Sequence, residues 1–404
     1  MLRAKHILVG ISGGIAAYKI PELIRHLRKA GADVRVCTTP NALEFVTELT
    51  LRTLSGAPVY SDVFAAINSH STEHISLPEW ADMMVVAPAT ANVLAKMAHG
   101  IADDALTTTF CTTLVAGKPI VIAPAMNDNM YNSPATQASL NTLRSWANVR
   151  VLDCAEGELA CGTSGKGRMQ EPDVIAEAVR QSLTPQDLLG RHVLITAGPT
   201  REKIDPVRYI SNYSSGKMGT ALALACARRG AHVTLIAGPM RVMPDFTAYP
   251  IVNVVHVESA REMHEAALAA WPTADTAVLC AAVADFAPAE TAPEKLKKQP
   301  GQTEMLLRLT LNPDIAAALG GSKRPGQRII GFALETQNEE ANALRKMHDK
   351  GLDFIVLNSL QDAGAGFGTD TNKVTIYALS EQKRTLPLMS KQAVAEQIVS
   401  ACIS

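Results

Sequence analysis

Short apolar runs alternate with longer amphipathic stretches from the start of the chain. Residues 6–12 (HILVGIS) form an apolar run that ends at two glycines. The next stretch, 15–31, places apolar residues at helical spacing and closes with Gly31, and a second apolar run follows at 32–39. This order predicts a βαβ unit whose glycine turn faces a helix N-terminus, where a phosphate group can bind.

The same pattern starts again in the second half of the chain. RHVLITAGPT at 191–200 is an apolar run that ends in a glycine turn, and residues 216–239 supply a helix, a glycine and another strand. The polar stretch QSLTPQDLLG at 181–190 separates the halves, and each half has the length of a doubly wound domain. We therefore predict an α/β protein with two doubly wound, Rossmann-like domains on mostly parallel sheets, residues 1–188 and residues 189–404.

Neither half carries the fingerprint of a dinucleotide-binding domain. The first glycine turn, GISGGIA at 10–16, lacks the G-x-G-x-x-G spacing. The strand after it ends in Cys37, Thr38 and Thr39, without the acidic residue that would hold a ribose hydroxyl. The sequence therefore favours phosphate-bearing ligands other than NAD and disfavours an NAD-dependent oxidoreductase.

Composition excludes several classes of partner. The chain has 404 residues, of which 47% are hydrophobic and 19% charged, and its net charge of −1 gives no electrostatic basis for binding nucleic acid or an anionic membrane. No apolar run approaches the roughly 18 residues that span a bilayer, and the N-terminal residues lack the pattern of a signal peptide. The seven cysteines include no C-x-x-C pair, so we expect no disulfide framework, no zinc cluster and a cytoplasmic location.

Three loops of the first half follow predicted strands and carry small and polar residues. They are Ser12-Gly13-Gly14, APATAN at 87–92 and PAMNDNMY at 124–131. Any one of them is an ordinary turn. Because the carboxyl ends of parallel strands meet at one edge of a sheet, three such loops together favour a ligand site, to which the glycine-rich stretch ACGTSGKGRM at 160–169 adds.

These motifs resemble those of known flavoproteins. PAMNDNMY resembles the P-x-M-N-x-x-M signature of homo-oligomeric flavin-containing cysteine decarboxylases, APATAN resembles their flavin-contacting loop, and ACGTSGKGRM resembles the substrate-recognition flap of 4′-phosphopantothenoylcysteine decarboxylases. With the second half, the chain resembles the bifunctional coenzyme A biosynthesis proteins over essentially its full length. The resemblance implies a flavodoxin-like flavoprotein domain that binds FMN and assembles as trimers, with flavin sites at subunit contacts.

The resemblance also implies a mechanism for the first domain. The substrate thiol is oxidised to a thioaldehyde, loss of CO₂ gives an enethiolate, and hydride return with protonation completes a redox-neutral cycle. Cys161 would donate the proton from a loop that closes over substrate, His74 would act as base, Asn127 would bind the departing carboxylate, and Met130 would line the pocket. Read without the resemblance, Cys161 is as easily an idle thiol, and His74 and Asn127 are solvated or structural residues.

Further contacts follow from the same resemblance. Lys166 and Arg168 would screen the substrate phosphate, although a basic loop is more often merely solvated. The implied flavin contacts are Ser12, Gly13, Thr38, Ala89, Thr90 and Asn92.

The second half contains two stretches too polar to be core. GPTREKIDPVRYISNYSSGKMG at 198–219 is a long loop without a Walker A motif, and Ser214 to Lys217 lead into an apolar helix whose N-terminus favours an anion. AAVADFAPAETAPEKLKKQ at 281–299 combines Asp285 with clustered lysines, which composition alone would read equally well as a solvated turn.

Together with NPDI at 312–315 and GFALET at 331–336, these stretches resemble 4′-phosphopantothenate–cysteine ligase. The resemblance implies that the acid's carboxylate attacks CTP to give an acyl cytidylate, which the cysteine amine then resolves, with Mg²⁺ bridging the phosphates. Lys295 would be the essential lysine, and Asn212 would hold the acyl intermediate. The implied substrate and nucleotide contacts are Ala281, Asp285, Pro313, Asp314, Ile315, Ala316, Phe332, Lys346 and Lys350.

The alternatives differ in class. A chain with one active half, a flavin-binding regulatory subunit and a peptide-modifying flavin decarboxylase all fit parts of the sequence. Cys161 counts against the regulatory subunit, because such relatives lack the flap cysteine, and the second half counts against the peptide-modifying enzyme. Tyr131, Tyr213 and Phe286 stand where the family often has Trp, His and Tyr, which puts pocket details in doubt rather than the activities.

Overall fold

The structure is a computed structural model. It describes residues 2–64, 73–158, 164–240, 243–244, 246, 249–298, 300, 303–335, 337–359 and 368–404. The chain divides into two compact units, Met1–Thr184 and Pro185–Ser404, within the polar stretch 181–190 that the sequence marks as a linker. Each unit has its own sheet and its own core.

The first unit is built on a parallel sheet. Its strand order is β3 (Val59–Tyr60), β2 (Asp33–Thr38), β1 (His6–Ile11), β4 (Met83–Ala89), β5 (Ile120–Pro124) and β6 (Val149–Val151). Every neighbouring pair is parallel. Without the two-residue β3, the order is 2-1-3-4-5, as in flavodoxin, and β3 at the edge extends it to the Rossmann order. The prediction of a doubly wound sheet is confirmed.

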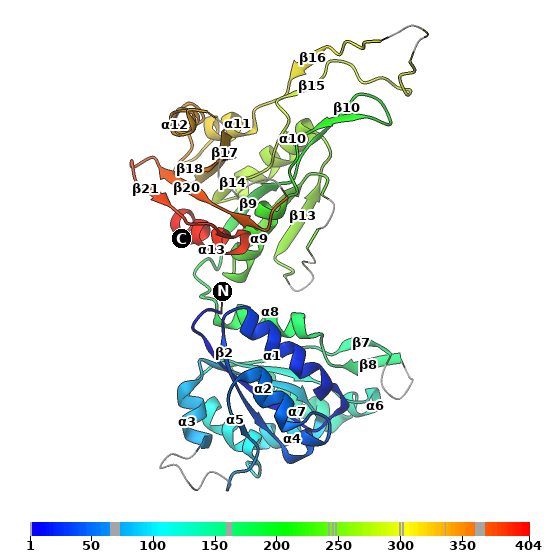
Figure 1. The fold of residues 1–404 in the computed structure, drawn as a ribbon, viewed down its shortest axis with the longest axis vertical. Coiled ribbons are helices and arrows are strands. Elements are labelled where there is room, and N and C mark those ends of the chain that lie inside the picture. The colour runs from blue at the N-terminus through cyan, green and yellow to red at the C-terminus, as the bar shows by residue number, and fades with distance from the viewer. Residues whose placement is uncertain are drawn as a thin grey trace. The chain divides into compact units, whose positions relative to one another are not determined.

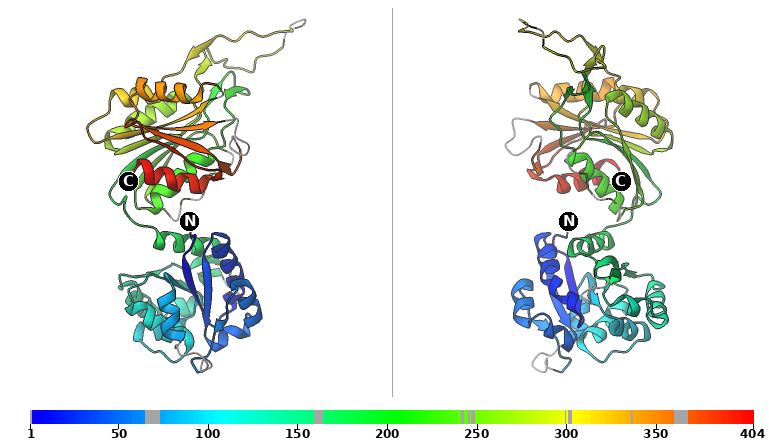
Figure 2. Two further views of the ribbon diagram at one scale, coloured as in Figure 1. Left: turned by 60° about the vertical axis from the view of Figure 1, so that its left-hand side comes forward. Right: turned by 90° about the vertical axis from the view of Figure 1, so that its right-hand side faces the viewer.

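Helices cover both faces of this sheet (Figures 1 and 2). One face packs against α1 (Ile20–Lys29), α2 (Glu48–Ser55) and α8 (Pro172–Leu183). The other packs against α3 (Glu73–Trp80), α4 (Ala91–His99), α5 (Ala105–Val115) and α7 (Pro134–Arg144). Val9 belongs to the first core and its neighbour Leu8 to the second, because successive strand side chains point to opposite faces.

Shorter elements complete the first unit. The helix expected at 15–31 is divided into a 3₁₀ turn, η1 (Ile15–Lys19), and α1, which begins with Pro21 in its first turn. A second 3₁₀ turn, η2 (Pro40–Glu44), follows β2. The remaining elements are α6 (Asp128–Tyr131) and an antiparallel hairpin of β7 (Ala155–Glu158) and β8 (Ser164–Arg168).

The second unit repeats the architecture and extends it. Its strand order is β13 (Val252–His256), β12 (His232–Ala237), β9 (His192–Ala197), β14 (Thr276–Leu279), β17 (Arg328–Glu335), β18 (Phe354–Ser359), β20 (Val374–Ala378) and β21 (Lys383–Thr385). The pairs up to β17–β18 are parallel, and β20 and β21 add antiparallel strands at one edge. Counted within the unit, the parallel strands again follow the Rossmann order.

Two groups of helices enclose the second sheet. One face packs against α9 (Lys217–Arg228) and α13 (Lys391–Cys402), and the other against α10 (Ala260–Ala270), η3 (Trp271–Thr273), α11 (Ile315–Gly321) and α12 (Glu339–Asp349). None of the described helices is long and apolar enough to cross a membrane.

Short ribbons extend from the second unit beyond its sheet (Figure 1). β10 (Arg201–Lys203) pairs with β11 (Tyr209–Ser211), and β15 (Phe286–Pro288) pairs with β16 (Leu309–Leu311). These two ribbons are joined where the backbone N–H of Ala292 donates to the Ile204 carbonyl at 3.0 Å. We call them together the arm. A third ribbon, β19 (Thr371–Asn372) with β22 (Met389–Ser390), precedes α13.

Candidate active sites

A pocket of about 1050 Å³ lies at the carboxyl ends of the strands of the first unit. The loops after β1, β4 and β5 all contribute to its wall, through Gly13, Thr90 and Asn127 among others. Because β1 and β4 flank the point where the strand order reverses, this is the edge at which doubly wound sheets bind ligands.

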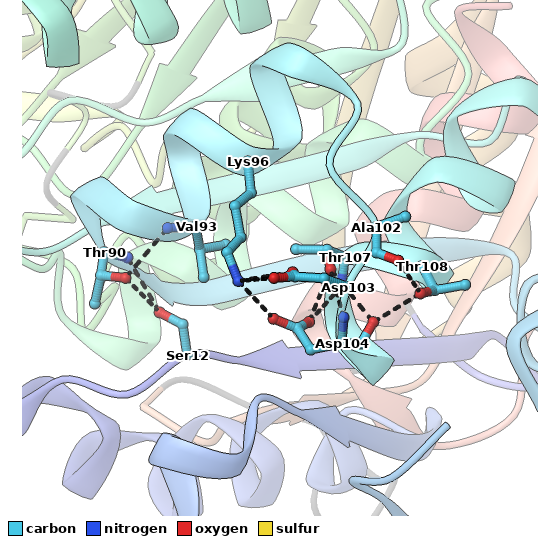
Figure 3. A network of polar contacts seen from close by, with 9 residues as sticks. All are labelled: Ser12, Thr90, Val93, Lys96, Ala102, Asp103, Asp104, Thr107 and Thr108. Atoms are coloured by element: carbon cyan, nitrogen blue, oxygen red, sulfur yellow. Dashed lines mark hydrogen bonds and ion pairs between the residues drawn. The ribbon is translucent and has the colours of Figure 1, made fainter. Parts of the chain in front are cut away.

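Hydrogen bonds tie two of these loops together (Figure 3). The Ser12 hydroxyl donates to the Pro88 carbonyl at 2.7 Å and accepts from the backbone N–H of Thr90 at 3.1 Å. The Thr90 hydroxyl caps α4 by accepting from Val93 N–H at 3.5 Å. Ser12 is fully buried, so it fixes the loop rather than facing the pocket.

The residues at the end of β2 suit a polar ligand such as a flavin. The hydroxyls of Thr38 and Thr39 are buried, and neither has a hydrogen-bond partner among the described residues. Such groups are costly unless something binds them. Thr39 lines the pocket, and Gly13 lies so close to η2 that an added Cβ would be 2.5 Å from the Cβ of Asn41. These threonine hydroxyls can donate hydrogen bonds, and the Gly13 turn packs tightly beside them. The site therefore suits a ligand whose oxygen atoms accept hydrogen bonds.

The β7–β8 hairpin is docked against the loop after β5. Gly167 O accepts from Met126 N–H, and Lys166 N–H donates to Asp128 Oδ1, both at 2.9 Å. Gly167 has a φ of +150°, and a Cβ there would be 2.3 Å from the Met126 carbonyl oxygen. Gly167 therefore allows the hairpin backbone to lie close to the backbone of Met126.

The second unit has a pocket of about 870 Å³ in the equivalent position. It opens at the carboxyl ends of β9, β14 and β17, and β9 and β14 flank the point where the strand order reverses. Residues from β17, from the loops after β14 and β16 and from α11 and α12 share its wall. The sequence-predicted residues that line it are Asn212, Ala281, Asp285, Pro313, Asp314, Ile315, Ala316, Phe332, Lys346 and Lys350.

Charge pairs hold two of these lysines. Lys350 contacts Asp314 at 2.9 Å, and Lys346 contacts Glu335 at 2.6 Å. Burial alone would raise the pKa of Asp314, but its bonds to Lys350 and to the Ala317 N–H outweigh burial and lower the pKa. The amide of Asn212 donates to the carbonyls of Ala282 and Val283 at 3.2 and 3.1 Å, which fixes it beside the loop after β14.

Comparison with known proteins decides between the families that such pockets allow. Residues 1–184 match the family described as flavoprotein, and residues 188–404 match the C-terminal domain of DNA/pantothenate metabolism flavoproteins. The coenzyme A biosynthesis bifunctional protein CoaBC of Vibrio vulnificus strain CMCP6 is 43% identical over 398 residues, covering 98% of this chain and 97% of that protein. The chain belongs to the family of coenzyme A biosynthesis bifunctional proteins.

Two further relatives are similar to this chain over most of its length. The family member from Bacillus subtilis strain 168 is 45% identical over 403 residues, covering 99% of this chain and 97% of that protein. A protein from an unknown prokaryotic organism, named cysteine/cysteine sulfinic acid decarboxylase, is 47% identical over 359 residues, covering 88% of this chain and 98% of that protein. The predicted family resemblance is confirmed, and the chain is an enzyme with a flavoprotein decarboxylase domain and a ligase domain.

Several residues that the family resemblance singled out lie away from the pockets. Thr38 and Ala89 are buried behind the wall of the first pocket, and Lys166 lies on the hairpin outside it. His74, on α3, does not line this pocket, and its backbone carbonyl accepts from the Thr112 hydroxyl at 2.7 Å. Cys161 lies outside the described residues.

Other predicted residues lie on the pocket wall. Gly13, Thr90, Asn92, Met130 and Arg168 line the first pocket. Asn127 lines it too, and its side-chain oxygen caps α6 by accepting from Asn129 N–H at 2.9 Å.

Lys295 is exposed on the arm and does not line the second pocket. The residue after it is held firmly: Leu296 N–H donates to Asp205 Oδ2 at 3.1 Å, and Arg208 donates to the Leu296 carbonyl at 2.7 Å. This anchoring fixes the backbone beside Lys295.

Sequence reasoning missed two charge clusters on the wall of the first pocket. Lys96 contacts Asp103 at 2.7 Å and Asp104 at 3.4 Å (Figure 3). Lys19 contacts Glu171 at 2.8 Å, and Glu171 also contacts Arg168 at 2.6 Å. Asp104 also forms a capping box at the start of α5, a local signal that could have been found. The Lys19–Glu171 pair joins residues 152 positions apart, for which a single sequence gives no signal.

Proposed function

We propose that residues 1–188 catalyse FMN-dependent decarboxylation of 4′-phosphopantothenoylcysteine to 4′-phosphopantetheine. We propose that residues 189–404 catalyse CTP-dependent ligation of cysteine to 4′-phosphopantothenate. The observation that carries this proposal is the second pocket, whose wall contains each of the expected nucleotide contacts from separate segments between 281 and 350. The first pocket supports the other half through the hydroxyl of Thr39, which lines the pocket, has no partner among the described residues and could bind a flavin.

In the decarboxylase, the protein's own residues would position the substrate and move protons. FMN, when bound, supplies reversible oxidation of the substrate thiol. Asn127, fixed at the start of α6, would donate its amide to the substrate carboxylate, and Met130 would pack beside it. Cys161 would protonate the reacting carbon, as a thiol with a pKa of about 8.5 is suited to reversible proton transfer. Arg168 and Lys166 would screen the substrate phosphate.

His74 would act across a subunit contact. Its helix lies outside the pocket of its own subunit, so it can serve as a base only in a neighbouring subunit's pocket. Such a role requires a homo-oligomer, which we propose is built on trimers of the flavin domain. A cytoplasmic location is supported by the described cysteines, all of which are free thiols.

In the ligase, positive charge would stabilise the nucleotide as the acid's carboxylate attacks its α-phosphate. Lys346 and Lys350 line the pocket and would supply this charge, and Lys295 would approach from the arm. Asn212 would hold the acyl intermediate while the cysteine amine attacks. Mg²⁺ would enter with the nucleotide, whose phosphate oxygens it prefers as ligands.

One reaction mixture tests the proposal. Flavin-loaded protein is incubated with 4′-phosphopantothenate, cysteine, CTP and Mg²⁺ and analysed by mass spectrometry, with a control that lacks CTP. We expect 4′-phosphopantetheine, CMP and CO₂ only when CTP is present. A product that stops at 4′-phosphopantothenoylcysteine would leave the ligase alone, and no product at all would favour a regulatory flavoprotein.

A second candidate substrate follows from the 47% identical relative. The same protein is given free cysteine or cysteine sulfinic acid without the acid or CTP. We expect no CO₂, because the first pocket offers Arg168 and Lys19 to a phosphate that neither compound has. CO₂ release at a comparable rate would assign the first domain to that other reaction.

A further inference from the structure

The wall of the second pocket contains a segment that cannot fix its own backbone conformation. Residues 281–284, between β14 and β15, read Ala-Ala-Val-Ala and carry no side chain that can form a hydrogen bond. All of them line the pocket together with Asp285, and we call residues 281–285 the alanine loop. Because its alanine and valine side chains cannot hold one conformation, groups from other segments must bind its backbone.

Two buried threonines bind N–H groups of the alanine loop. The Thr196 hydroxyl, on β9, accepts from Ala281 N–H at 3.3 Å. The Thr200 hydroxyl, in the segment after β9, accepts from Ala284 N–H at 3.0 Å. Thr196 is 2% exposed and Thr200 is 0% exposed, so water does not replace either acceptor easily.

Two asparagines bind the carbonyl groups of the alanine loop. The Asn312 side-chain amide donates to the Ala284 carbonyl at 2.8 Å, and the Asn312 backbone N–H donates to the Asp285 carbonyl at 2.9 Å. The Asn212 amide donates to two further carbonyls of the loop, as described above. Hydroxyl acceptors therefore bind the N–H groups of the loop, and amide donors bind its carbonyls.

Ala284 is the residue at which these contacts meet. Its N–H is bound by Thr200 and its carbonyl by Asn312, and the residue is 6% exposed. Asn312 is followed directly by Pro313 and Asp314, which line the same pocket. Asn312 thus joins two segments of the pocket wall, the alanine loop and the residues that begin α11.

We propose that Thr200 and Asn312 are positioning residues for the nucleotide, which hold the alanine loop and the residues before α11 in the arrangement that binds CTP. The inference rests on the proposed ligase function, which assigns nucleotide contacts to both segments. Thr200 does not line the pocket, so it acts only through the loop. A loop that is already held in place loses little conformational entropy when a ligand binds, whereas a released loop must be ordered first.

Calorimetric titration of the flavin-loaded, full-length protein with CTP tests the proposal. Thr200→Val keeps a branched side chain but removes the acceptor for Ala284 N–H, and Thr200→Ser retains that acceptor. Thr276→Val is the matched control, because Thr276 is a buried threonine at the amino end of β14 and does not line the pocket. We expect Thr200→Val to weaken CTP binding at least about fivefold, Thr200→Ser to restore it, and Thr276→Val to leave it unchanged.

Thermal unfolding separates positioning from general loss of stability. Both valine variants remove a buried hydroxyl from the second unit, so both should lower the unfolding midpoint, and the titrations are made well below it. Wild-type affinity for CTP in folded Thr200→Val protein would overturn the proposal. An equal loss of affinity in Thr276→Val would overturn it too, because affinity would then follow stability alone. A wild-type protein that binds CTP but does not ligate would refute the proposed function and leave this test intact.

Asn312→Ala provides an independent test from the other side of Ala284. It removes the amide donor to the Ala284 carbonyl, and Asn253→Ala is its control, because Asn253 is an exposed asparagine on β13 outside the pocket. We expect Asn312→Ala to weaken CTP binding about fivefold. Combined with Thr200→Val, the loss should be smaller than the product of the two single losses, because both residues act on Ala284. Losses that multiply in full would mean that the two residues act separately, and the shared role would be abandoned.

Discussion

Asp205 is a buried carboxylate that organises two segments far apart in the sequence. Its Oδ1 accepts from the backbone N–H groups of Val207 and Arg208, both at 2.8 Å. Its Oδ2 accepts from the Arg208 guanidinium and from Leu296 N–H. A carboxylate with this many donors is stabilised in its charged form, and the Arg208 guanidinium is the largest cause of a strongly lowered pKa. The backbone beside Lys295 is therefore anchored by a group that does no chemistry itself.

Asp205→Asn should reduce both ligation and the stability of the second unit. An amide presents two N–H donors where Arg208 and Leu296 donate, so at least one bond is lost and the segment is released. We expect the ligation kcat to fall about tenfold, with decarboxylation unchanged. In a Lys295→Gln background, Asp205→Asn should add little, because the two changes act through the same segment. Independent, multiplying losses in the double variant would mean that Asp205 acts elsewhere.

The pH dependence of stability follows from the same residue. Its folded pKa lies below the unfolded value of about 3.9, so the native state binds this proton less readily than the unfolded state does. The stabilisation is therefore present above about pH 4 and is lost as the pH falls below that. Urea unfolding followed from pH 7 to pH 3 should show the wild type and Asp205→Asn converging on acidification. A difference that stays constant over this range would assign the effect to packing instead of charge.

Cys161→Ser should abolish decarboxylation and spare ligation. A serine hydroxyl is a far weaker acid than a thiol, so protonation of the reacting carbon should slow by about 10²-fold or more. Cys111→Ser is the control, because Cys111 is a half-buried thiol on α5 away from the pocket wall. Single-turnover mass spectrometry with 4′-phosphopantothenoylcysteine measures the loss. Normal production of 4′-phosphopantetheine by Cys161→Ser would remove this cysteine from the mechanism.

At the scale of elements, docking of the β7–β8 hairpin depends on glycines. Gly167 combines a positive φ with a backbone approach that leaves no room for a Cβ. Gly100, at the end of α4, has a φ of +71° but nothing within 4 Å of the position of a Cβ. Alanine substitutions at Gly167 and Gly100 therefore separate the free-energy cost of a left-handed backbone from the cost of a steric clash.

Gly167→Ala should therefore destabilise the first unit more than Gly100→Ala. The control should lose about 1 kcal/mol, the cost of the left-handed backbone. Gly167→Ala adds a contact at 2.3 Å with a carbonyl oxygen, so the hairpin should shift away from Met126 and FMN should dissociate more readily. Unfolding midpoints and flavin fluorescence report the two effects. Equal losses for both variants would mean that the hairpin tolerates the shift.

The regular elements could be predicted from the sequence because their signals are local. Apolar runs such as 6–12 and 191–200 gave strands close to their observed bounds, and the restart of the pattern gave two domains. The helix expected at 15–31 was only partly right, because the residues after Gly14 form a 3₁₀ turn before Pro21 starts α1. The arm was not foreseen, since its strands are three residues long and pair only with each other. Pairing of that kind leaves no periodicity in the sequence.

At the scale of the molecule, the residues of the candidate sites divide into those that the sequence could place and those that it could not. Loops such as APATAN and NPDI could be placed at a ligand edge, because the topology of parallel sheets brings strand ends together. Lys19 and Glu171 could not, because each contacts a partner contributed by a distant element. His74 is the opposite case: the motif was recognised, but the fold of one subunit keeps it off the pocket wall.

The position of His74 away from the pocket wall leads to a prediction about assembly. If His74 of one subunit completes the pocket that contains Asn127 of another, His74→Ala and Asn127→Ala should each be inactive, yet their mixture should recover activity. Random exchange in a cyclic oligomer leaves about a quarter of the pockets with both residues intact, so decarboxylation should return to about that fraction of the wild-type rate. The variants are mixed, partly unfolded and refolded together, with each refolded alone as the control. Mixed oligomers that stay inactive would place His74 and Asn127 in the same subunit's site or remove His74 from the reaction. Recovery would mean that the first unit decarboxylates its substrate only as an oligomer. Dilution to monomers should then abolish decarboxylation, with ligation measured separately.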